Sequence, residues 1–279
     1  MTQLQSIDGL AAVAGGYDAI FCDVWGVVHD GEKKSPSAEA ALAAARTAGC
    51  RVFLLTNSPR RAESVASQLD AFGVARSAYD GIVTSGDVTR ALIARAGKEL
   101  FHLGPARDVD LFADLDVALV PADKAEAVVC TGLVNDEVET PEDYAATLAQ
   151  MQARGLPMIC ANPDIVVHRG DRLIWCAGAL ARDYVALGGD VRMAGKPYRP
   201  IYEEACLAAA IAPGQTVLAI GDGLNTDIRG ANDFGLDVLL IVGGIHGAEL
   251  GSAGGEPRAL ERLLAEQDLT ARYFMPSLA

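Results

Sequence analysis

Short apolar runs rich in β-branched and aromatic residues alternate with longer alanine-rich segments along most of this chain. AIFCD at 19–23 is followed by a helical pattern over 35–49, and RVFLLT at 51–56 is followed by another over 60–73. Serine and proline at the start of the first helical pattern, and glycine at its end, are typical of helix boundaries. This alternation predicts an α/β fold in which helices cover both faces of a doubly wound parallel sheet.

The middle of the chain continues the alternation with shorter strands. ELFHLG, VALV, AVVCTG and LPMICAN are candidate strands, with the amphipathic helix PEDYAATLAQMQARG between the last two. From about Val191 a third block contains a helix, the strand TVLAIGD, a helix near IRGANDFG and the strand DVLLIVGG. At 279 residues the chain is long for one core, so we expect two modest domains or one core with a large insertion.

The composition excludes some classes of partner. A formal net charge of −14 argues against a broad grip on nucleic acid or on an anionic membrane, because either needs clustered Lys and Arg. No basic leader and no uncharged run of about 20 apolar residues is present, so we expect a cytoplasmic protein. The six cysteines form no C-x-x-C pair and lie mostly in apolar runs, which predicts reduced core residues.

Three apolar runs end in a polar residue that a small or turn-forming residue follows. These residues are Asp23, Thr56 and Asp222. In an open parallel sheet, ligands bind at the carboxyl ends of the strands, so neighbouring strands would bring the three side chains together. The alternative is that each is only a helix cap or a turn residue.

Three motifs add candidate chemistry. GDGLNTDIRGA places Asp222 and Asp227 around a glycine-rich turn, and carboxylate oxygens in a tight turn suit Mg²⁺, although ordinary loops also contain such pairs. AGKPYRP holds Lys196 in a rigid turn, as a phosphate-binding charge or as a solvated surface lysine. LLTNSPR offers Thr56, Asn57 and backbone N–H groups at the start of a helix, which could bind an anion or simply cap the helix.

In this order, the motifs around Asp23, Thr56, Lys196 and Asp222 resemble those of the haloacid dehalogenase (HAD) superfamily. The resemblance extends over nearly the whole chain. More narrowly, the chain resembles the class IIA branch of sugar-phosphate, nitrophenyl-phosphate and nucleotide phosphatases. The stretches IVTSGDVTRALI, ANPD, AGAL and AGKP also match that branch. It implies a core domain of residues 1–86 and 188–279 and an inserted α/β cap domain of residues 87–187.

The resemblance also implies roles for individual residues. Asp23 would attack phosphorus and form an aspartyl-phosphate, and would bind Mg²⁺ together with the backbone carbonyl of Trp25, Asp222 and Asp227. Thr56 and Lys196 would hold the transferring phosphoryl group, mostly by positioning and electrostatics. Further implications are a small phosphorylated metabolite as substrate, an approach of the cap to the core through Asn162 and Asp164, and a homodimer formed through the cap as one expected assembly.

Trp25 departs from the family pattern, because phosphatases of this superfamily normally have an aspartate two residues after the nucleophile. Indole cannot protonate a leaving group or activate water. A general acid or base is worth about 10²- to 10⁴-fold in rate, so we expect weak activity on alkyl phosphates and better activity on aryl, acyl or anhydride phosphates. His29 or Asp30 could substitute for it, and His246 could line the pocket, although all three also suit ordinary loops.

Two other functions stay open from the sequence. An aromatic residue at this position is similar to the dehalogenase branch, whose members displace halide without a metal. That branch, however, lacks the acidic turn found here and carries its cap elsewhere. Alternatively, Trp25 packs inside a protein that binds a phosphorylated ligand without converting it.

Overall fold

The computed structural model describes residues 4–169, 172–243 and 257–279. The chain forms two compact units. The first comprises Met1–Thr56, Ala66–Val83 and Tyr202–Ala279, and the second comprises Asn57–Val65 and Thr84–Ile201. Boundaries between the units therefore fall inside β4 (Gly81–Thr84) and α6 (Arg199–Ala208).

The first unit is built on a seven-stranded sheet in the order β1-β14-β13-β12-β2-β3-β4. Besides β4, its strands are β1 (Gln5–Ser6), β2 (Ala19–Asp23), β3 (Arg51–Thr56), β12 (Val217–Gly221), β13 (Asp237–Ile241) and β14 (Tyr273–Met275). The pairings from β1 to β3 are all parallel. From β2 the chain adds β3 and β4 on one side and later β12, β13 and β14 on the other. The sheet therefore reverses its strand order between β2 and β12, where an open sheet of this kind forms a ligand crevice.

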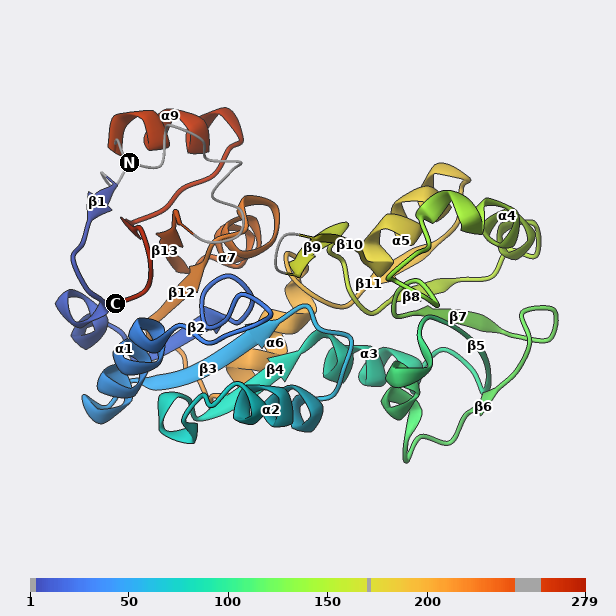
Figure 1. Ribbon diagram of the computed structural model, residues 1–279, viewed down its shortest axis with the longest axis horizontal. Coiled ribbons are helices and arrows are strands. Elements are labelled where there is room, and N and C mark those ends of the chain that lie inside the picture. The colour runs from blue at the N-terminus through green and yellow to red at the C-terminus, as the bar shows by residue number, and fades with distance from the viewer. Residues whose placement is uncertain (1–3, 170–171, 244–256) are drawn as a thin grey trace. The chain divides into compact units, whose positions relative to one another are not determined.

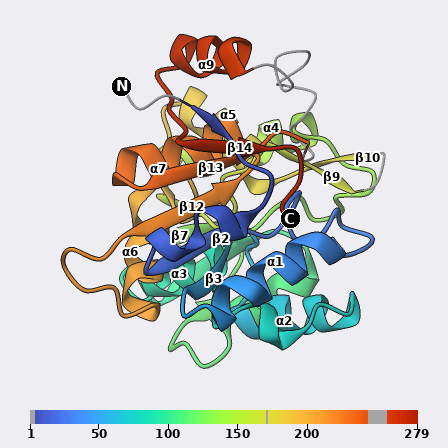
Figure 2. The same cartoon turned by 90° about the vertical axis from the view of Figure 1, so that its left-hand side faces the viewer.

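Helices cover both faces of this sheet. Figure 2 shows α1 and α2 on one side of it and α6 and α7 on the other. The α-helices that lie wholly in this unit are α1 (Pro36–Thr47), α7 (Arg229–Phe234) and α9 (Pro257–Glu266). The helix α2 (Ala62–Ala71) is divided between the two units after Val65. Short helical turns are η1 (Leu10–Ala12), η2 (Ala14–Gly16), η3 (Arg76–Ala78) and the π-turn η6 (Leu224–Ile228). All five residues of β2 and of β12 are buried, as expected for central parallel strands.

The second unit contains a five-stranded parallel sheet in the order β11-β8-β7-β5-β6. Its strands are β5 (Glu99–Leu103), β6 (Ala118–Leu119), β7 (Ala127–Cys130), β8 (Met158–Cys160) and β11 (Val191–Met193). The helices are α3 (Ser85–Ile93), α4 (Ala145–Ala153), α5 (Ala177–Ala186), η4 (Ala106–Phe112) and η5 (Pro141–Tyr144). In Figure 1, α4 and α5 lie on one face of this sheet and α3 lies on the other.

Alternate residues of β7 belong to different clusters of the second unit's core. Val128 and Cys130 pack with α4 and α5, whereas Ala127 and Val129 pack with residues of α3 and η4. This follows from the two-residue period of a strand. Both faces of the sheet are therefore buried, which confirms the predicted α/β class for this part of the chain.

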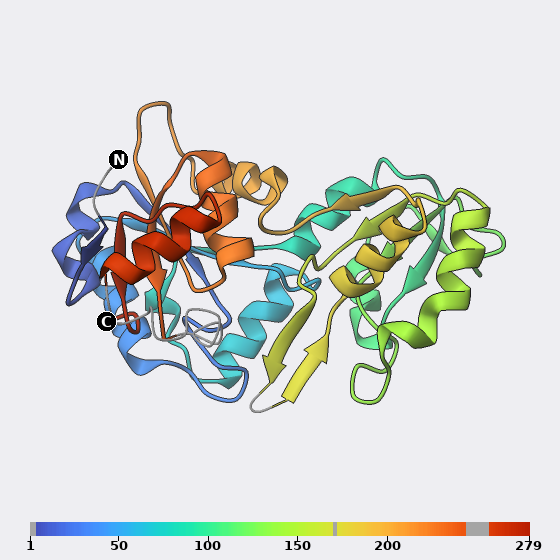
Figure 3. The ribbon, with the colours of Figure 1, turned by 90° about the horizontal axis from the view of Figure 1, so that it is seen from above.

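Local signals explain where the elements begin and where the predictions missed them. The run GIVTSG at 81–86 reads as one strand in the sequence, but β4 ends at Thr84, because the Thr84 side chain accepts the backbone N–H of Asp87 at 3.0 Å and starts α3 at Ser85. The sequence reading also missed an antiparallel hairpin of β9 (Val166–Arg169) and β10 (Arg172–Trp175). Figure 3 shows it as a two-stranded ribbon separate from the larger sheet.

The cysteines behave as the sequence predicts. None forms a disulfide; five are buried, and Cys206 on α6 is half-buried. Burial raises the pKa of Cys50 to about 11 and the pKa of Cys130 to about 12. Within the part of the chain that the structure describes, no helix is long and apolar enough to cross a membrane.

The two units differ in three segments from the predicted core and cap. Asn57–Val65, residues 84–86 and residues 188–201 cluster with the second unit, although the sequence reading placed all three in the core. The predicted domain boundaries at residues 87 and 187 remain a prediction, because a compact unit of the fold need not coincide with an evolutionary insertion.

Candidate active site

Three carboxylates of the first unit converge at the carboxyl edge of its sheet. Asp23, Asp222 and Asp227 each offer an oxygen, and these oxygens lie within 4.8 Å of one another. The three residues are only 7%, 1% and 7% exposed. Asp23 ends β2 and Asp222 directly follows β12, and the parallel pairing of Ile220 with Cys22 sets the two strand ends level. The reversal of strand order thus brings together residues that lie about two hundred positions apart in sequence.

The turn after β12 directs Asp227 back toward the strand end. The Gly223 carbonyl accepts the N–H groups of Asp227 and Ile228 at 2.9 and 3.1 Å, and in return the Asp227 carboxylate accepts the Gly223 N–H at 3.1 Å. A Cβ added at Gly221 would lie 2.3 Å from the Asp227 Cβ. The glycines of GDGLNTD therefore allow the second aspartate to pack directly against the end of the strand.

The loop after Asp23 lies directly against Asp222. Gly26 has a φ of +93°, and a Cβ added there would lie 2.4 Å from Asp222 Oδ2. Only glycine combines this backbone conformation with such a close approach. The backbone next to Trp25 therefore borders the carboxylates, which suits the predicted use of the Trp25 carbonyl as a metal ligand.

These residues fit a hard divalent cation. Two ionised carboxylates at the upper limit of these separations, 4.8 Å, repel by about 3.5 kcal/mol at an effective dielectric constant of 20. Because three such groups are buried together, a cation bound among them would remove a substantial cost of folding. The donors are all oxygens, the type that Mg²⁺ and Ca²⁺ prefer.

Thr56 lies at the same edge of the sheet as Asp23. It is the last residue of β3, and the pairing of Asp23 with Leu55 places it one position beyond the nucleophile candidate. Its side chain is 7% exposed. The hydroxyl is thus held at the level of the carboxylates by the neighbouring strand.

Trp25 packs against the turn that follows β2. Its ring lies 5.1 Å from the ring of His29, which in turn lies 5.0 Å from the ring of Phe72. A Cβ at Gly31 would lie 2.7 Å from the indole ring. The indole Nε1–H is buried and has no hydrogen-bond partner among the described residues. Trp25 therefore shapes the wall of this loop and leaves one buried donor unused.

The candidate substitutes for the missing aspartate have structural roles in this loop. His29 is buried, and its Nδ1 accepts the Gly31 N–H at 3.0 Å, so Nδ1 is unavailable as a base. Asp30 Oδ1 accepts the N–H groups of Glu32 and Lys33, both at 2.9 Å. These backbone hydrogen bonds help to keep the pKa of Asp30 below its usual value, against the opposing effect of partial burial. His246 lies outside the described residues.

In the second unit, the side chain of Asn57 bonds to the backbone of Lys196. The Asn57 side chain accepts the Lys196 N–H at 2.7 Å and donates to the Lys196 carbonyl at 3.0 Å and to Asp164 at 2.8 Å. Lys196 is 4% exposed, so it is not a solvated surface lysine. The helix α2 begins at Ala62, inside the helical pattern predicted over 60–73, so Asn57 lies in the loop that precedes it. Asn57 thus positions the backbone around Lys196, and its side chain is already occupied by these bonds.

Asn162 also has a local structural role. Its side-chain oxygen accepts the Asp164 N–H at 3.0 Å, which forms a turn directly after β8. Asp164, in the same ANPD motif, is the residue that reaches Asn57. The sequence reading did not foresee the polar residues at the ends of β5 and β7, although the strand-end rule applied to AVVCTG would have selected Thr131.

Comparisons with known proteins identify the family of this chain. The model of the haloacid dehalogenase-like hydrolases matches residues 20–118, and a HAD-hydrolase-like model matches residues 193–266. A crystal structure of a haloacid dehalogenase-like hydrolase from Brucella suis 1330 shares 49% identity, covers 98% of this chain and 100% of its own, and superposes with a TM-score of 0.88. The chain therefore belongs to the haloacid dehalogenase-like hydrolase family, which is a family of enzymes.

More distant relatives carry functional names. A D-glycerol 3-phosphate phosphatase from Mycobacterium tuberculosis is 28% identical over 86% of this chain and 67% of its own length. A crystal structure of glycerol phosphate phosphatase from the same organism, in complex with magnesium, is 26% identical, covers 84% of this chain and 70% of its own, and has a TM-score of 0.67. A possible sugar phosphatase of the HAD superfamily from Cytophaga hutchinsonii, at 22% identity and a TM-score of 0.79 over 98% of both chains, shares the fold.

Proposed function

We propose that the protein is a Mg²⁺-dependent phosphatase or phosphotransferase acting on a small phosphorylated metabolite. The observation that carries the proposal is the convergence of Asp23, Asp222 and Asp227 at the strand reversal. The magnesium complex of the related glycerol phosphate phosphatase supports the choice of cation. When bound, the cation would neutralise the carboxylates and the phosphoryl oxygens, so that one anion can approach another.

The proposed chemistry uses an oxygen of Asp23 as nucleophile. This oxygen forms a bond to phosphorus while the bond from phosphorus to the ester oxygen breaks and the alcohol leaves. Water then attacks the aspartyl-phosphate, which releases inorganic phosphate and restores the Asp23 carboxylate. Transfer to another acceptor would follow the same path with an alcohol in place of water. We assign Thr56 and Lys196 to the binding of the phosphoryl group.

Trp25 restricts which leaving groups this chemistry can use. Without an acid at that position, the departing oxygen must leave as an anion or take its proton from solvent. Phenolate and carboxylate leave readily in this way, whereas an alkoxide does not. We therefore propose aryl, acyl or anhydride phosphates as better substrates than alkyl phosphates.

Phosphate release from phenyl phosphate and from glycerol 3-phosphate tests the proposal. We expect Mg²⁺-dependent turnover of phenyl phosphate that EDTA abolishes and that Asp23→Asn lowers by at least a thousandfold. Equal turnover in Asp23→Asn would refute the mechanism. Release of chloride from 2-chloropropionate in the presence of EDTA would instead indicate a dehalogenase.

The variant Trp25→Asp tests the role of the tryptophan. If the lack of an acid at position 25 limits the rate, the variant should turn over glycerol 3-phosphate about 10²-fold faster than the wild type. Its gain on phenyl phosphate should be much smaller. An equal gain on both substrates would contradict the leaving-group argument. If neither the wild type nor the variant hydrolyses either substrate while Mg²⁺ still binds, the result favours a protein that binds a phosphorylated ligand without converting it.

A further inference from the structure

Residues from four sequence motifs meet around Lys196 in the second unit. Asn57 belongs to LLTNSPR, Asp164 to ANPD, Gly178 to AGAL, and Gly195 with Lys196 to AGKP. All of these residues lie in the second unit, so the contacts among them are internal to one compact unit. The chemistry proposed above gives no task to ANPD or to AGAL.

The side-chain amide of Asn57 pairs with both backbone groups of Lys196. Its Oδ1 accepts the Lys196 N–H at 2.7 Å, and its Nδ2 donates to the Lys196 carbonyl at 3.0 Å. A paired β-strand holds the backbone of a residue in the same way. The two residues are only 5% and 4% exposed, so water does not compete for these bonds. The amide therefore fixes the point of the backbone from which the lysine side chain projects.

Asp164 determines which way round the Asn57 amide lies. Nδ2 of Asn57 also donates to Asp164 Oδ1 at 2.8 Å. An ionised carboxylate can only accept hydrogen bonds. In a reversed amide, the oxygen would face the Asp164 carboxylate and the NH₂ group would face the Lys196 N–H, so all three bonds would be lost. Asp164 thus selects the one orientation in which the amide matches the backbone of Lys196.

Glycine at position 195 allows the amide to reach this backbone. A Cβ added at Gly195 would lie 2.3 Å from Asn57 Oδ1 and 2.8 Å from Pro163 Cδ. A larger residue would therefore push the amide oxygen away from the Lys196 N–H. The turns of ANPD and AGKP pack directly against each other and against Asn57.

The backbone of Asp164 is itself held on both sides. Its N–H donates to the side chain of Asn162 at 3.0 Å, and its carbonyl accepts the Gly178 N–H at 3.1 Å. A Cβ added at Gly178 would lie 2.5 Å from this carbonyl oxygen. The glycine of AGAL therefore lets the start of α5 close over the ANPD turn.

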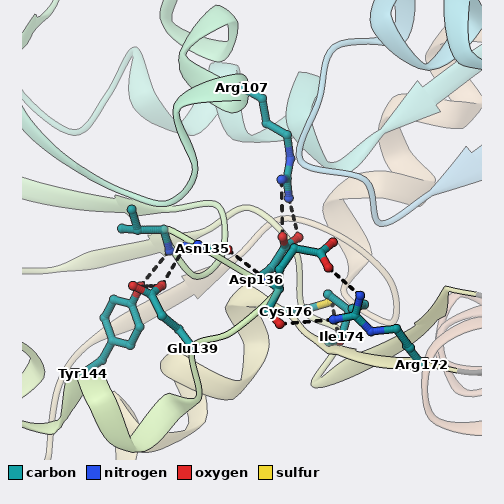
Figure 4. Close-up of polar contacts among 10 residues, drawn as sticks. Arg107, Asn135, Asp136, Glu139, Tyr144, Arg172, Ile174 and Cys176 are labelled. Carbon is teal, nitrogen blue, oxygen red and sulfur yellow. Dashed lines mark hydrogen bonds and ion pairs between the residues drawn. The ribbon is translucent and has the colours of Figure 1, made fainter.

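The hairpin of β9 and β10 connects Asp164 to α5 and is anchored at two places. At its base, the Cys176 N–H donates to the Ile165 carbonyl at 2.9 Å. Along β10, Arg172 donates to the side chain and the carbonyl of Glu137, at 2.6 and 3.1 Å, in the loop that follows β7 (Figure 4). These anchors restrict the movement of the segment that carries Asp164, so its carboxylate is preorganised.

We propose that Asp164 is a positioning residue for Lys196. Its carboxylate orients the Asn57 amide, the amide fixes the backbone of Lys196, and the lysine ammonium is thereby presented to the phosphoryl group. The inference rests on the proposed function, because that function assigns the phosphoryl group to Lys196. It predicts an unusual sign, since an acidic residue strengthens the binding of an anion.

Calorimetric titration with phenylphosphonate, in Mg²⁺, tests this sign without any turnover. Asp164→Ala should bind about tenfold more weakly than the wild type. Asp164→Asn keeps an acceptor oxygen and should bind within about threefold of the wild type. Loss of a nearby negative charge alone would instead tighten the binding in both variants. Equal or tighter binding by Asp164→Ala would therefore overturn the proposal.

Two further variants serve as a control and as a test of the route. Asp183→Ala removes a surface aspartate of the same unit that pairs with its neighbour Arg182, and it should bind phenylphosphonate as the wild type does. Gly195→Ala displaces the Asn57 amide while Asp164 is retained, and it should bind about tenfold more weakly. Unchanged binding in Gly195→Ala would contradict the route through Asn57.

A double-mutant cycle with Lys196→Met separates this inference from the proposed function. If Asp164 acts through Lys196, Asp164→Ala should change the affinity by less than about twofold in the Lys196→Met background. An equal loss in both backgrounds would overturn the positioning role. Unchanged binding in Lys196→Met would refute the assignment of Lys196, and with it this inference. Weaker binding in Lys196→Met but not in Asp164→Ala would refute the inference alone.

The response to Mg²⁺ shows whether Asp164→Ala keeps its fold. The three carboxylates of the candidate metal site belong to the first unit. Asp164→Ala should therefore show the same rise in Tm with Mg²⁺ as the wild type, while kcat/KM for phenyl phosphate falls about tenfold. Loss of the Mg²⁺ response together with the phosphonate affinity would show a general structural role for Asp164 and would contradict positioning.

Discussion

Neutralising Asp222 should remove the response of the protein to Mg²⁺ without destabilising the metal-free form. In the cluster, Asp222 takes part in two carboxylate pairs, each with oxygens within 4.8 Å, and two ionised carboxylates at that limit repel by about 3.5 kcal/mol. The change Asp222→Asn keeps the shape of the side chain and removes both repulsions. Asp222 also interacts with other neighbouring groups, and losing those interactions offsets part of this gain. We therefore expect metal-free Asp222→Asn to be at least as stable as the metal-free wild type.

The wild type should gain stability from the cation by mass action. At a free Mg²⁺ concentration one hundred times Kd, a site that exists only in the folded protein adds about 2.7 kcal/mol. For a chain of this size each kcal/mol raises Tm by about 2–4 °C, so we expect a rise of about 5–10 °C. Asp222→Asn should rise by less than about 2 °C under the same conditions.

Thermal unfolding followed by circular dichroism, first in EDTA and then across a Mg²⁺ titration, measures both effects. The matched control is Asp233→Asn, an exposed aspartate of the same unit, which should respond to Mg²⁺ as the wild type does. A full Mg²⁺ response in Asp222→Asn would show that the buried carboxylates are not the binding site. A metal-free variant several degrees less stable than the metal-free wild type would show that the favourable interactions of Asp222 outweigh the repulsion between the carboxylates.

Three further changes test other parts of the structure. Gly26→Ala should cost about 1–3 kcal/mol and weaken the Mg²⁺ response, because its Cβ meets Asp222 and its φ is positive; Gly15→Ala, which has open space, is the control in the same melts. Burial lowers the pKa of His102 below its ordinary 6.5, so the unfolded chain binds a proton more readily and stability should fall as pH drops below about 6.5; urea unfolding at pH 5–7 should show a smaller loss in His102→Gln. Asn57→Ala should lower the unfolding free energy in urea by about 1–3 kcal/mol, since it leaves buried backbone groups unpaired, and an unchanged midpoint would contradict the role assigned to that side chain.

The sequence predicted the carboxylate cluster because one rule suffices to place it. Apolar runs that end in Asp23 and Asp222 become neighbouring strands at a reversal of order, and the parallel register then brings the carboxylates together. The glycines of the turn after β12 also indicated the position of Asp227. Apolar periodicity and helix boundaries likewise predicted most strands and helices.

Other features depend on contacts that no local pattern encodes. Asn57 looked like a ligand-binding residue, but its amide bonds Lys196 and Asp164, residues more than one hundred positions away. Trp25 left two interpretations open, and only the structure places its ring against His29. The hairpin of β9 and β10 was missed because each strand has only four residues. Such short runs carry little periodicity, and each strand pairs only with the other.

The distribution of thiols gives the protein a natural labelling position. Reagents such as maleimides react with thiolates, and buried sulfurs with raised pKa values form few of them. The half-buried Cys206 should therefore be the first to be alkylated in the native protein. The boundary between the two units falls inside its helix, α6. A single fluorophore on Cys206 would therefore report the environment of the helix that connects the units, without any engineered cysteine.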